Sequence, residues 1–160
     1  MDVIENLIAG HREVFEKKDL LAKLAASINN DAFFWDNVPK IQVFFNKEVK
    51  QHFELEEKVL FPEMKKIVPK EDQGKIAEIE NEHKPILEII AQLDGAMEEH
   101  SKNPNKSTRE RVADVAGRLM EKLIPHAQKE DAELFPMVRK YFKAGNFIKL
   151  EAAYFKFLGV

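Results

Sequence analysis

The segment HFELEEKVLFP at residues 52–62 recurs with the same spacing as HAQKEDAELFP at residues 126–136. Both copies fit the pattern H-x3-E-[ED]-x2-L-F-P and lie 74 positions apart, and His11 and His83 are separated by 72 positions. We therefore interpret the chain as two helical hairpins, each with one histidine on its first helix and an H-x3-E motif on its second. Such a duplication predicts an all-α fold, an up-down-up-down antiparallel four-helix bundle with approximate two-fold symmetry.

Apolar residues around these motifs recur every three or four positions, as they do on one buried face of a helix. The spacing predicts a single domain over residues 1–160, with a pseudo-repeat of residues 1–68 and 69–143. The first predicted helix runs from Ile4 to Ile28 and is followed by a break at Asn29-Asn30-Asp31, and the second begins near Asp36 with Pro39 in its first turn. The third predicted helix follows Val68-Pro69 and ends at 101–107. The fourth opens with a capping box at Ser107-Thr108-Arg109-Glu110 and stops at Gly145, and a short helix follows at 146–158.

Composition agrees with a helical protein and excludes several functional classes. The 160 residues include one threonine, two tyrosines and no cysteine, and the formal net charge is -3. Without cysteine there is no disulfide, zinc knuckle, iron-sulfur cluster or thiol nucleophile in the chain. The weak negative charge argues against nucleic acid as the main partner, and the charged N-terminal segment argues against a signal peptide or membrane association. We expect a cytoplasmic protein.

The four repeated histidines are predicted to lie at one height in the bundle. Residues on neighbouring antiparallel helices are level when they lie equally far from the connecting loop, since each residue adds about 1.5 Å. His11 lies about 21 residues before a loop centred near residue 32, and His52 lies about 20 after it. The same comparison around residues 69 and 104 places His83 and His126 in this layer.

Two carboxylates belong to the same layer. Residues four apart on a helix share a face, so Glu56 and Glu130 project into the same space as the histidines. A buried set of ionisable side chains would cost a core heavily unless something compensated for their desolvation. We therefore predict a binding site in the core rather than a purely structural cluster.

Imidazole nitrogen and carboxylate oxygen, without sulfur, suit iron, manganese or zinc. Two glutamates between two pairs of histidines are what a two-metal site needs, because each carboxylate can bridge two ions. With a shared oxo or hydroxo ligand, an octahedral metal keeps an open position, which on iron can take a small ligand such as O2, NO or peroxide. The expected apolar lining of the pocket, with plain core packing as the alternative role, consists of Phe15, Phe45, Leu55, Ile79, Ile86, Leu119 and Leu123.

The chain resembles the hemerythrin-like proteins with the HHE cation-binding domain, over about 140 of its 160 residues. The resemblance implies a four-helix bundle with a non-haem di-iron centre. It implies two iron ions held by His11, His52, His83 and His126 as terminal ligands and by Glu56 and Glu130 as bridges. The four-His, two-Glu set is similar to the branch that includes iron-sulfur cluster repair proteins, whereas the oxygen-carrying branch has a second histidine four residues from His83, where this chain has Ile79 and Leu87.

Several functions remain open at this stage. A di-iron protein that binds or reacts with O2, NO or peroxide is the leading hypothesis. The alternatives are an iron donor for repair of damaged iron-sulfur clusters, a sensor that passes a change to a protein partner, and a metal-free helical interaction domain.

Some individual residues also have predicted roles. Glu80 precedes His83 by three positions and is a candidate for an extra ligand, while His100 is expected to lie in solvent. Glu57 and Asp131 are expected to be surface charges, with a contact to a ligand histidine as the alternative. The two tyrosines, Tyr141 and Tyr154, are assigned packing roles.

Overall fold

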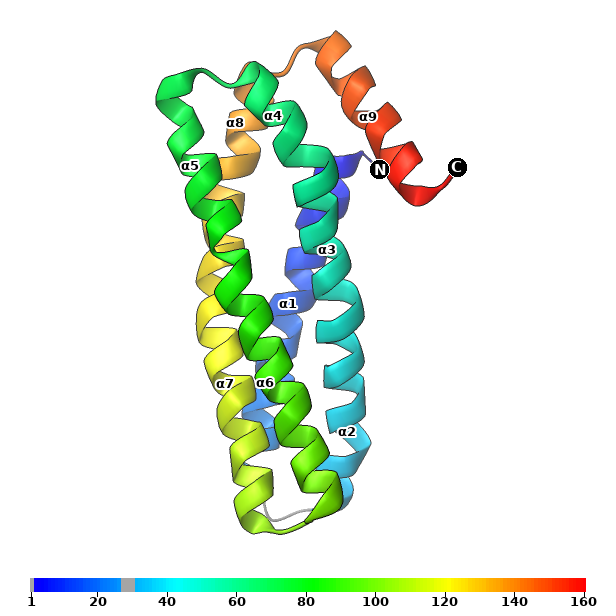
Figure 1. Ribbon diagram of the computed structural model, residues 1–160, viewed down its shortest axis with the longest axis vertical. Coiled ribbons are helices and arrows are strands. Elements are labelled where there is room, and N and C mark those ends of the chain that lie inside the picture. Colours follow the sequence, from blue (N-terminus) through cyan, green and yellow to red (C-terminus); the bar gives the residue numbers. More distant parts are fainter. Residues whose placement is uncertain (1, 27–30) are drawn as a thin grey trace.

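The protein is a bundle of four long antiparallel rods, with a fifth helix, α9, at the end where the chain begins (Figure 1). The computed structural model describes residues 2–26 and 31–160, and within these ranges it contains no strand. The helical segments are α1 (Val3–Ala26), α2 (Asp31–Val43), η1 (Phe44–Val49), α3 (Lys50–Leu55), η2 (Glu56–Leu60), α4 (Phe61–Ile67), α5 (Lys70–Asn81), α6 (His83–Lys102), α7 (Lys106–Lys129), η3 (Glu130–Leu134), α8 (Phe135–Tyr141) and α9 (Ala144–Leu158). The three η segments are π-helical turns.

These segments join into rods in chain order. The first rod is α1, the second runs from α2 to α4, the third consists of α5 and α6, and the fourth runs from α7 to α8. Figure 1 shows that successive rods run in opposite directions, which confirms the predicted four-helix bundle with a short C-terminal helix. Within the described ranges, no helix is long and apolar enough to cross a membrane.

Prolines explain where the third rod begins and where it is interrupted. Val68 has an extended backbone, with φ of -68° and ψ of 133°, because the ring of Pro69 disfavours helix at the preceding residue. Pro85 has no N–H to donate to the carbonyl of Asn81, and α5 gives way to α6 at Glu82. This interruption falls next to His83, the first residue of α6.

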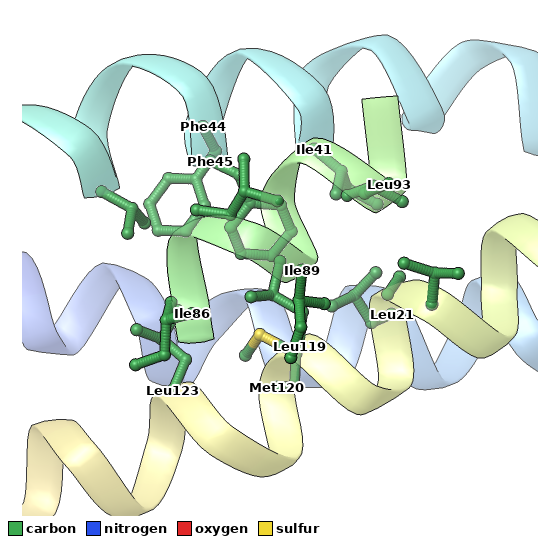
Figure 2. Packing of buried hydrophobic residues seen from close by; sticks show 14 of the residues in the cluster. Leu21, Ile41, Phe44, Phe45, Ile86, Ile89, Leu93, Leu119, Met120 and Leu123 are labelled. Atoms are coloured by element: carbon green, nitrogen blue, oxygen red, sulfur yellow. The ribbon is translucent and has the colours of Figure 1, made fainter. Parts of the chain in front are cut away.

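The apolar core is divided into two clusters by the histidine layer. The lower cluster contains Phe45, Ile90 and Leu119 among others, and Figure 2 shows that all four rods contribute to it. The upper cluster contains Leu7, Leu60 and Ile79 among others, and α9 covers part of it through Leu150. In every rod the candidate ligands lie in sequence at the boundary between the two clusters, so packing above and below fixes the height of the layer.

Two predicted helix boundaries are wrong, namely the start of the second rod and the end of the fourth. The second rod begins at Asp31, not near Asp36. Gly145 does not stop the fourth rod, which ends at Tyr141, because Phe142 takes an extended backbone and α9 has already begun at Ala144. The predicted extension of the first helix to Ile28 and the break at Asn29 and Asn30 fall outside the described residues.

The fourth rod opens two residues earlier than the capping box predicted from Ser107. Asn105 is the N-cap, and its side chain accepts a hydrogen bond from the Thr108 N–H at 2.9 Å, while the Thr108 hydroxyl accepts one from the Asn105 N–H at 3.1 Å. The same hydroxyl lies 2.6 Å from Nδ1 of His100. His100 is therefore buried, with 1% of its surface exposed, and the expectation that it lies in solvent is wrong. It continues the inner face of α6 from Leu93 and Ala96.

Replacing Thr108 by valine is expected to lower the free energy of unfolding by about 1–3 kcal/mol, because the methyl group cannot replace the cap or the contact to His100. Urea unfolding measures the change. Thr108→Ser keeps the hydroxyl and should stay close to the wild type. Equal losses in the two variants would show that the hydroxyl is not what stabilises this end of the bundle.

Candidate metal centre

The six predicted ligand residues come together in the middle of the bundle. Each rod contributes one histidine, and the second and fourth rods each add one glutamate. Their ligand atoms form two groups that share Glu130, and within each group the atoms lie within 4.8 Å of one another; the groups are Glu56, His83, His126 and Glu130, and His11, His52 and Glu130.

The imidazole Nε2 atoms face the two carboxylates. Glu130 Oε1 lies 2.9 Å from His11 Nε2 and 3.6 Å from His126 Nε2, so this carboxylate joins the first and fourth rods. Glu56 Oε1 lies 3.4 Å from Nε2 of both His52 and His83 and joins the second and third rods. Each carboxylate therefore faces imidazoles from two different rods.

The carboxylates begin π-helical turns, and proline gives the reason. Glu56 is the first residue of η2, where the Phe61 N–H donates to the Glu56 carbonyl five residues back, and Pro62 follows. Glu130 begins η3 in the same way, ahead of Pro136. A proline ring clashes with the carbonyl four residues before it, and a widened turn relieves this contact. The L-F-P part of each motif thus shapes the backbone directly after each candidate bridging residue.

Several polar atoms of the layer have no hydrogen-bond partner among the described residues. They are both carboxylate oxygens of Glu56, Oε2 of Glu130, and Nε2 of His83 and His126. Buried polar atoms are nearly always paired, since leaving one without a partner costs free energy. All of them are lone-pair donors without sulfur, and bound cations would satisfy them together. The residues present therefore fit a metal centre.

Three of the four histidines have a second carboxylate on their outer ring nitrogen, Nδ1. Each carboxylate comes from a neighbouring rod, and the Nδ1-to-oxygen distances are 2.7 Å for His11 and Asp131, 2.9 Å for His83 and Glu57, and 2.8 Å for His126 and Glu82. A carboxylate on Nδ1 fixes the ring orientation and makes the opposite nitrogen a stronger ligand.

For Glu57 and Asp131 the structure supports the alternative prediction, a contact to a ligand histidine. Both side chains remain partly exposed, and each reaches a histidine on another rod. The repeated acid in the sixth position of the motif was the available signal for this role. Glu82 was missed, because its partner His126 lies 44 positions away and no repeat marks it.

Replacing Glu57 by glutamine is expected to weaken metal binding in the group that contains His83 by about 10- to 100-fold. The amide keeps a hydrogen-bond acceptor but removes the negative charge that supports the ring. Metal affinity from competition with a chelator measures the effect. Glu63→Gln on the same rod removes an exposed ion pair with Lys66 and should leave affinity unchanged; an identical loss in both variants would contradict this role of Glu57.

The electrostatics of the layer are those of a site that needs positive charge. Burial raises the pKa of Glu56 well above its usual range, and the charge of Glu130 adds to the effect. Burial acts on Glu130 in the same direction, but the neighbouring Glu56 carboxyl and His11 imidazole outweigh it and hold the pKa of Glu130 well below its usual range. Burial also lowers the pKa of His52 and His83, which favours the neutral, metal-binding form of both rings.

A cavity of about 610 Å³ leads to the layer from one side of the bundle. Its walls come from α1, the second rod, the end of α7 and α9, and it reaches His11, His52, His126 and Glu130. The side chain of His52 is 13% exposed, against 4% for His11 and 2% for His83. His52 is therefore the candidate ligand nearest to solvent.

The predicted lining of the pocket is largely wrong. Leu55 and Leu123 border the cavity, but the other predicted lining residues do not. Phe45 and Leu119 instead fill the lower cluster, and Ile79 fills the upper one. Periodicity identified these residues as buried but could not show which gap between rods stays open. The remaining members, Phe15 and Ile86, also pack in or against the lower cluster.

The secondary predictions have mixed outcomes. Glu80 belongs to neither group and forms an ion pair with Lys65 at 3.0 Å, so its role as an extra ligand is not supported by the structure. Tyr141 and Tyr154 pack against the upper cluster as predicted. The Tyr154 hydroxyl also accepts a hydrogen bond from Asn6 and lines the cavity.

Comparison with known proteins gives one family. Residues 2–138 match the family described as hemerythrin HHE cation binding domain. This range contains the first three rods and all but the last three residues of the fourth, and it excludes α9. No curated protein and no solved structure matches the chain. The match spans most of the sequence, and the buried His and Glu groups within it are able to hold a metal ion. The chain belongs to the hemerythrin HHE cation-binding family.

Proposed function

We propose that the protein is a non-haem di-iron protein that binds or reacts with O2, NO or peroxide. The observation that supports this most strongly is the buried layer of four imidazoles and two carboxylates, in which polar atoms on Glu56, Glu130, His83 and His126 have no partner among the described residues. Membership of a cation-binding family supports the same proposal.

In this proposal each side chain has a defined task. The four histidines together with Glu56 and Glu130 would hold a pair of iron ions, which would supply electrons and bind the small ligand. Asp131 and Glu57 orient the rings of His11 and His83 through Nδ1. Leucine and phenylalanine side chains form part of the cavity wall that reaches the layer, which favours a neutral ligand.

Charges along the cavity favour the same class of ligand. Glu13, Glu48 and Glu54 are exposed and line it, with Lys58 the basic residue of the lining. A negative surface repels anions such as superoxide or nitrite and does not affect O2, NO or hydrogen peroxide.

Metal analysis of the full chain purified from iron-supplied cells tests the proposal. We expect about two iron ions per chain, absorption bands that change on exposure to O2, azide or NO, and loss of iron in His126→Ala. A chain without metal, or a metal content that His126→Ala leaves unchanged, would contradict the di-iron proposal and favour a metal-free interaction domain.

Iron donation for cluster repair is the second candidate. The cavity of about 610 Å³ is far larger than a diatomic ligand needs, and it reaches the partly exposed His52. Incubating the iron-loaded protein with an apo iron-sulfur protein separates the two functions. Transfer of iron under reducing conditions would support donation, whereas retention of iron with a spectrum responsive to NO would support ligand binding.

A further inference from the structure

The two halves of the layer differ in how their histidines are held. His83 and His126 each have a carboxylate on Nδ1, and so does His11. For Nδ1 of His52 the described residues supply no hydrogen-bond partner, although its Nε2 faces His11 at 3.2 Å and Glu56 at 3.4 Å. His52 is thus the histidine of the layer with the least support and the greatest exposure.

A glycine lies beside Nδ1 of His52, the ring nitrogen that carries a carboxylate in the other three histidines. A Cβ built on Gly10 of α1 would be 3.4 Å from Cε1 and 2.8 Å from Nδ1 of His52, and the latter distance is closer than real Cβ contacts allow. Glycine inside a helix is unfavourable relative to alanine. The contact explains why it stands here, because the Cβ of any other residue would displace the imidazole.

The cavity connects this weakly held ring to solvent. Gly10 and His52 both line it, and the acidic side chains of Glu13, Glu48 and Glu54 lie along the same walls. Buried Glu130, whose Oε2 has no hydrogen-bond partner among the described residues, also belongs to the lining. Negative charge at the mouth attracts a cation, and lone pairs inside can accept it.

The opposite side of the layer is more closed. A second groove touches His83 beside α5 and α6, but the Glu57 carboxylate occupies the outer nitrogen of that ring, and 2% of the His83 side chain is exposed. His126 borders the first cavity, but its side chain is equally buried and is held by Glu82.

We propose that the divalent cation held by His11, His52 and Glu130 is the exchangeable one, that it passes through the cavity between α1 and the second rod, and that Gly10 is the positioning residue that admits the His52 ring. The cation in the group of Glu56, His83 and His126 is retained. The inference rests on the proposed two-metal function.

Chelator challenge of the full chain loaded anaerobically with Fe(II) tests the inference. Release to a chromogenic ferrous chelator should occur in two phases of about one ion per chain each, with rate constants that differ by about 10-fold or more. A single phase, or two ions released at the same rate, would overturn it. A chain that takes up no iron at the loading step would overturn the proposed function as well, so the two failures are told apart.

Two variants assign the phases to the halves. Gly10→Ala should lower loading toward one ion per chain and remove the fast phase, while Glu57→Gln should accelerate only the slow phase. Gly117→Ala is the matched control, because an added Cβ there meets nothing within 4 Å and α7 gains the same helix preference. Melting of the apo forms verifies folding. Equal effects of Gly10→Ala on both phases, or none on either, would contradict the assignment.

Discussion

Replacing Glu130 by alanine is expected to reduce bound metal from the proposed two ions per chain to nearly none. Glu130 belongs to both groups of ligand atoms and lies 2.9 Å from His11 and 3.6 Å from His126, so its loss removes a donor from each group. Metal that binds only the folded state stabilises it by about 4 kcal/mol per site when free metal exceeds Kd by about 1,000-fold. The variant should therefore lose a metal-dependent rise in Tm on the order of 10 °C.

Glu133→Ala is the control for this experiment. Glu133 lies in the same π-helical turn but forms an exposed ion pair with Lys75. Elemental analysis and thermal melts with and without Fe(II) measure both variants. A Glu130→Ala protein that still binds two ions, or melts higher with metal by as much as the wild type, would show that this carboxylate does not join the two groups.

Replacing Phe53 by alanine is expected to lower the free energy of unfolding by about 3–5 kcal/mol. Phe53 is buried in the lower cluster, its ring stacks on His83 with centroids 3.9 Å apart, and it makes a T-shaped contact with the His126 ring, with centroids 5.5 Å apart. It also borders the cavity, so truncation removes a wall between the core and the site. Urea denaturation of the apo protein gives the value directly.

Phe53→Leu keeps most of the apolar volume and loses the ring stacking. A cost below about 1.5 kcal/mol is expected for this substitution. If Phe53→Ala unfolds within about 1 kcal/mol of the wild type, the boundary between cluster and site is not packed as tightly as the ring contacts indicate.

The repeated motif predicted both the fold and which residues meet. Because helix rise is constant, distances from the loops placed His11, His52, His83 and His126 at one height, and the structure brings all four together. That prediction needed the loop positions only to within about a turn. Predicting the start of the second rod too late in the sequence therefore did not affect it.

Contacts between rods were harder to predict. Glu57 and Glu82 act on histidines of neighbouring rods, and the rotation of one rod relative to another cannot be read from the spacing within either. Likewise, nothing local showed that Thr108 would cap the fourth rod and contact His100 at once. Gly10 likewise carries no signal in the sequence, because its close approach to the His52 ring is visible only in the structure.

An iron-edge anomalous difference map from crystals of the loaded protein tests the two-metal proposal most directly. We predict two peaks within the histidine layer, one among His11, His52 and Glu130 and one among Glu56, His83 and His126. A single peak, a peak outside this layer, or none in crystals whose iron content has been verified would contradict it.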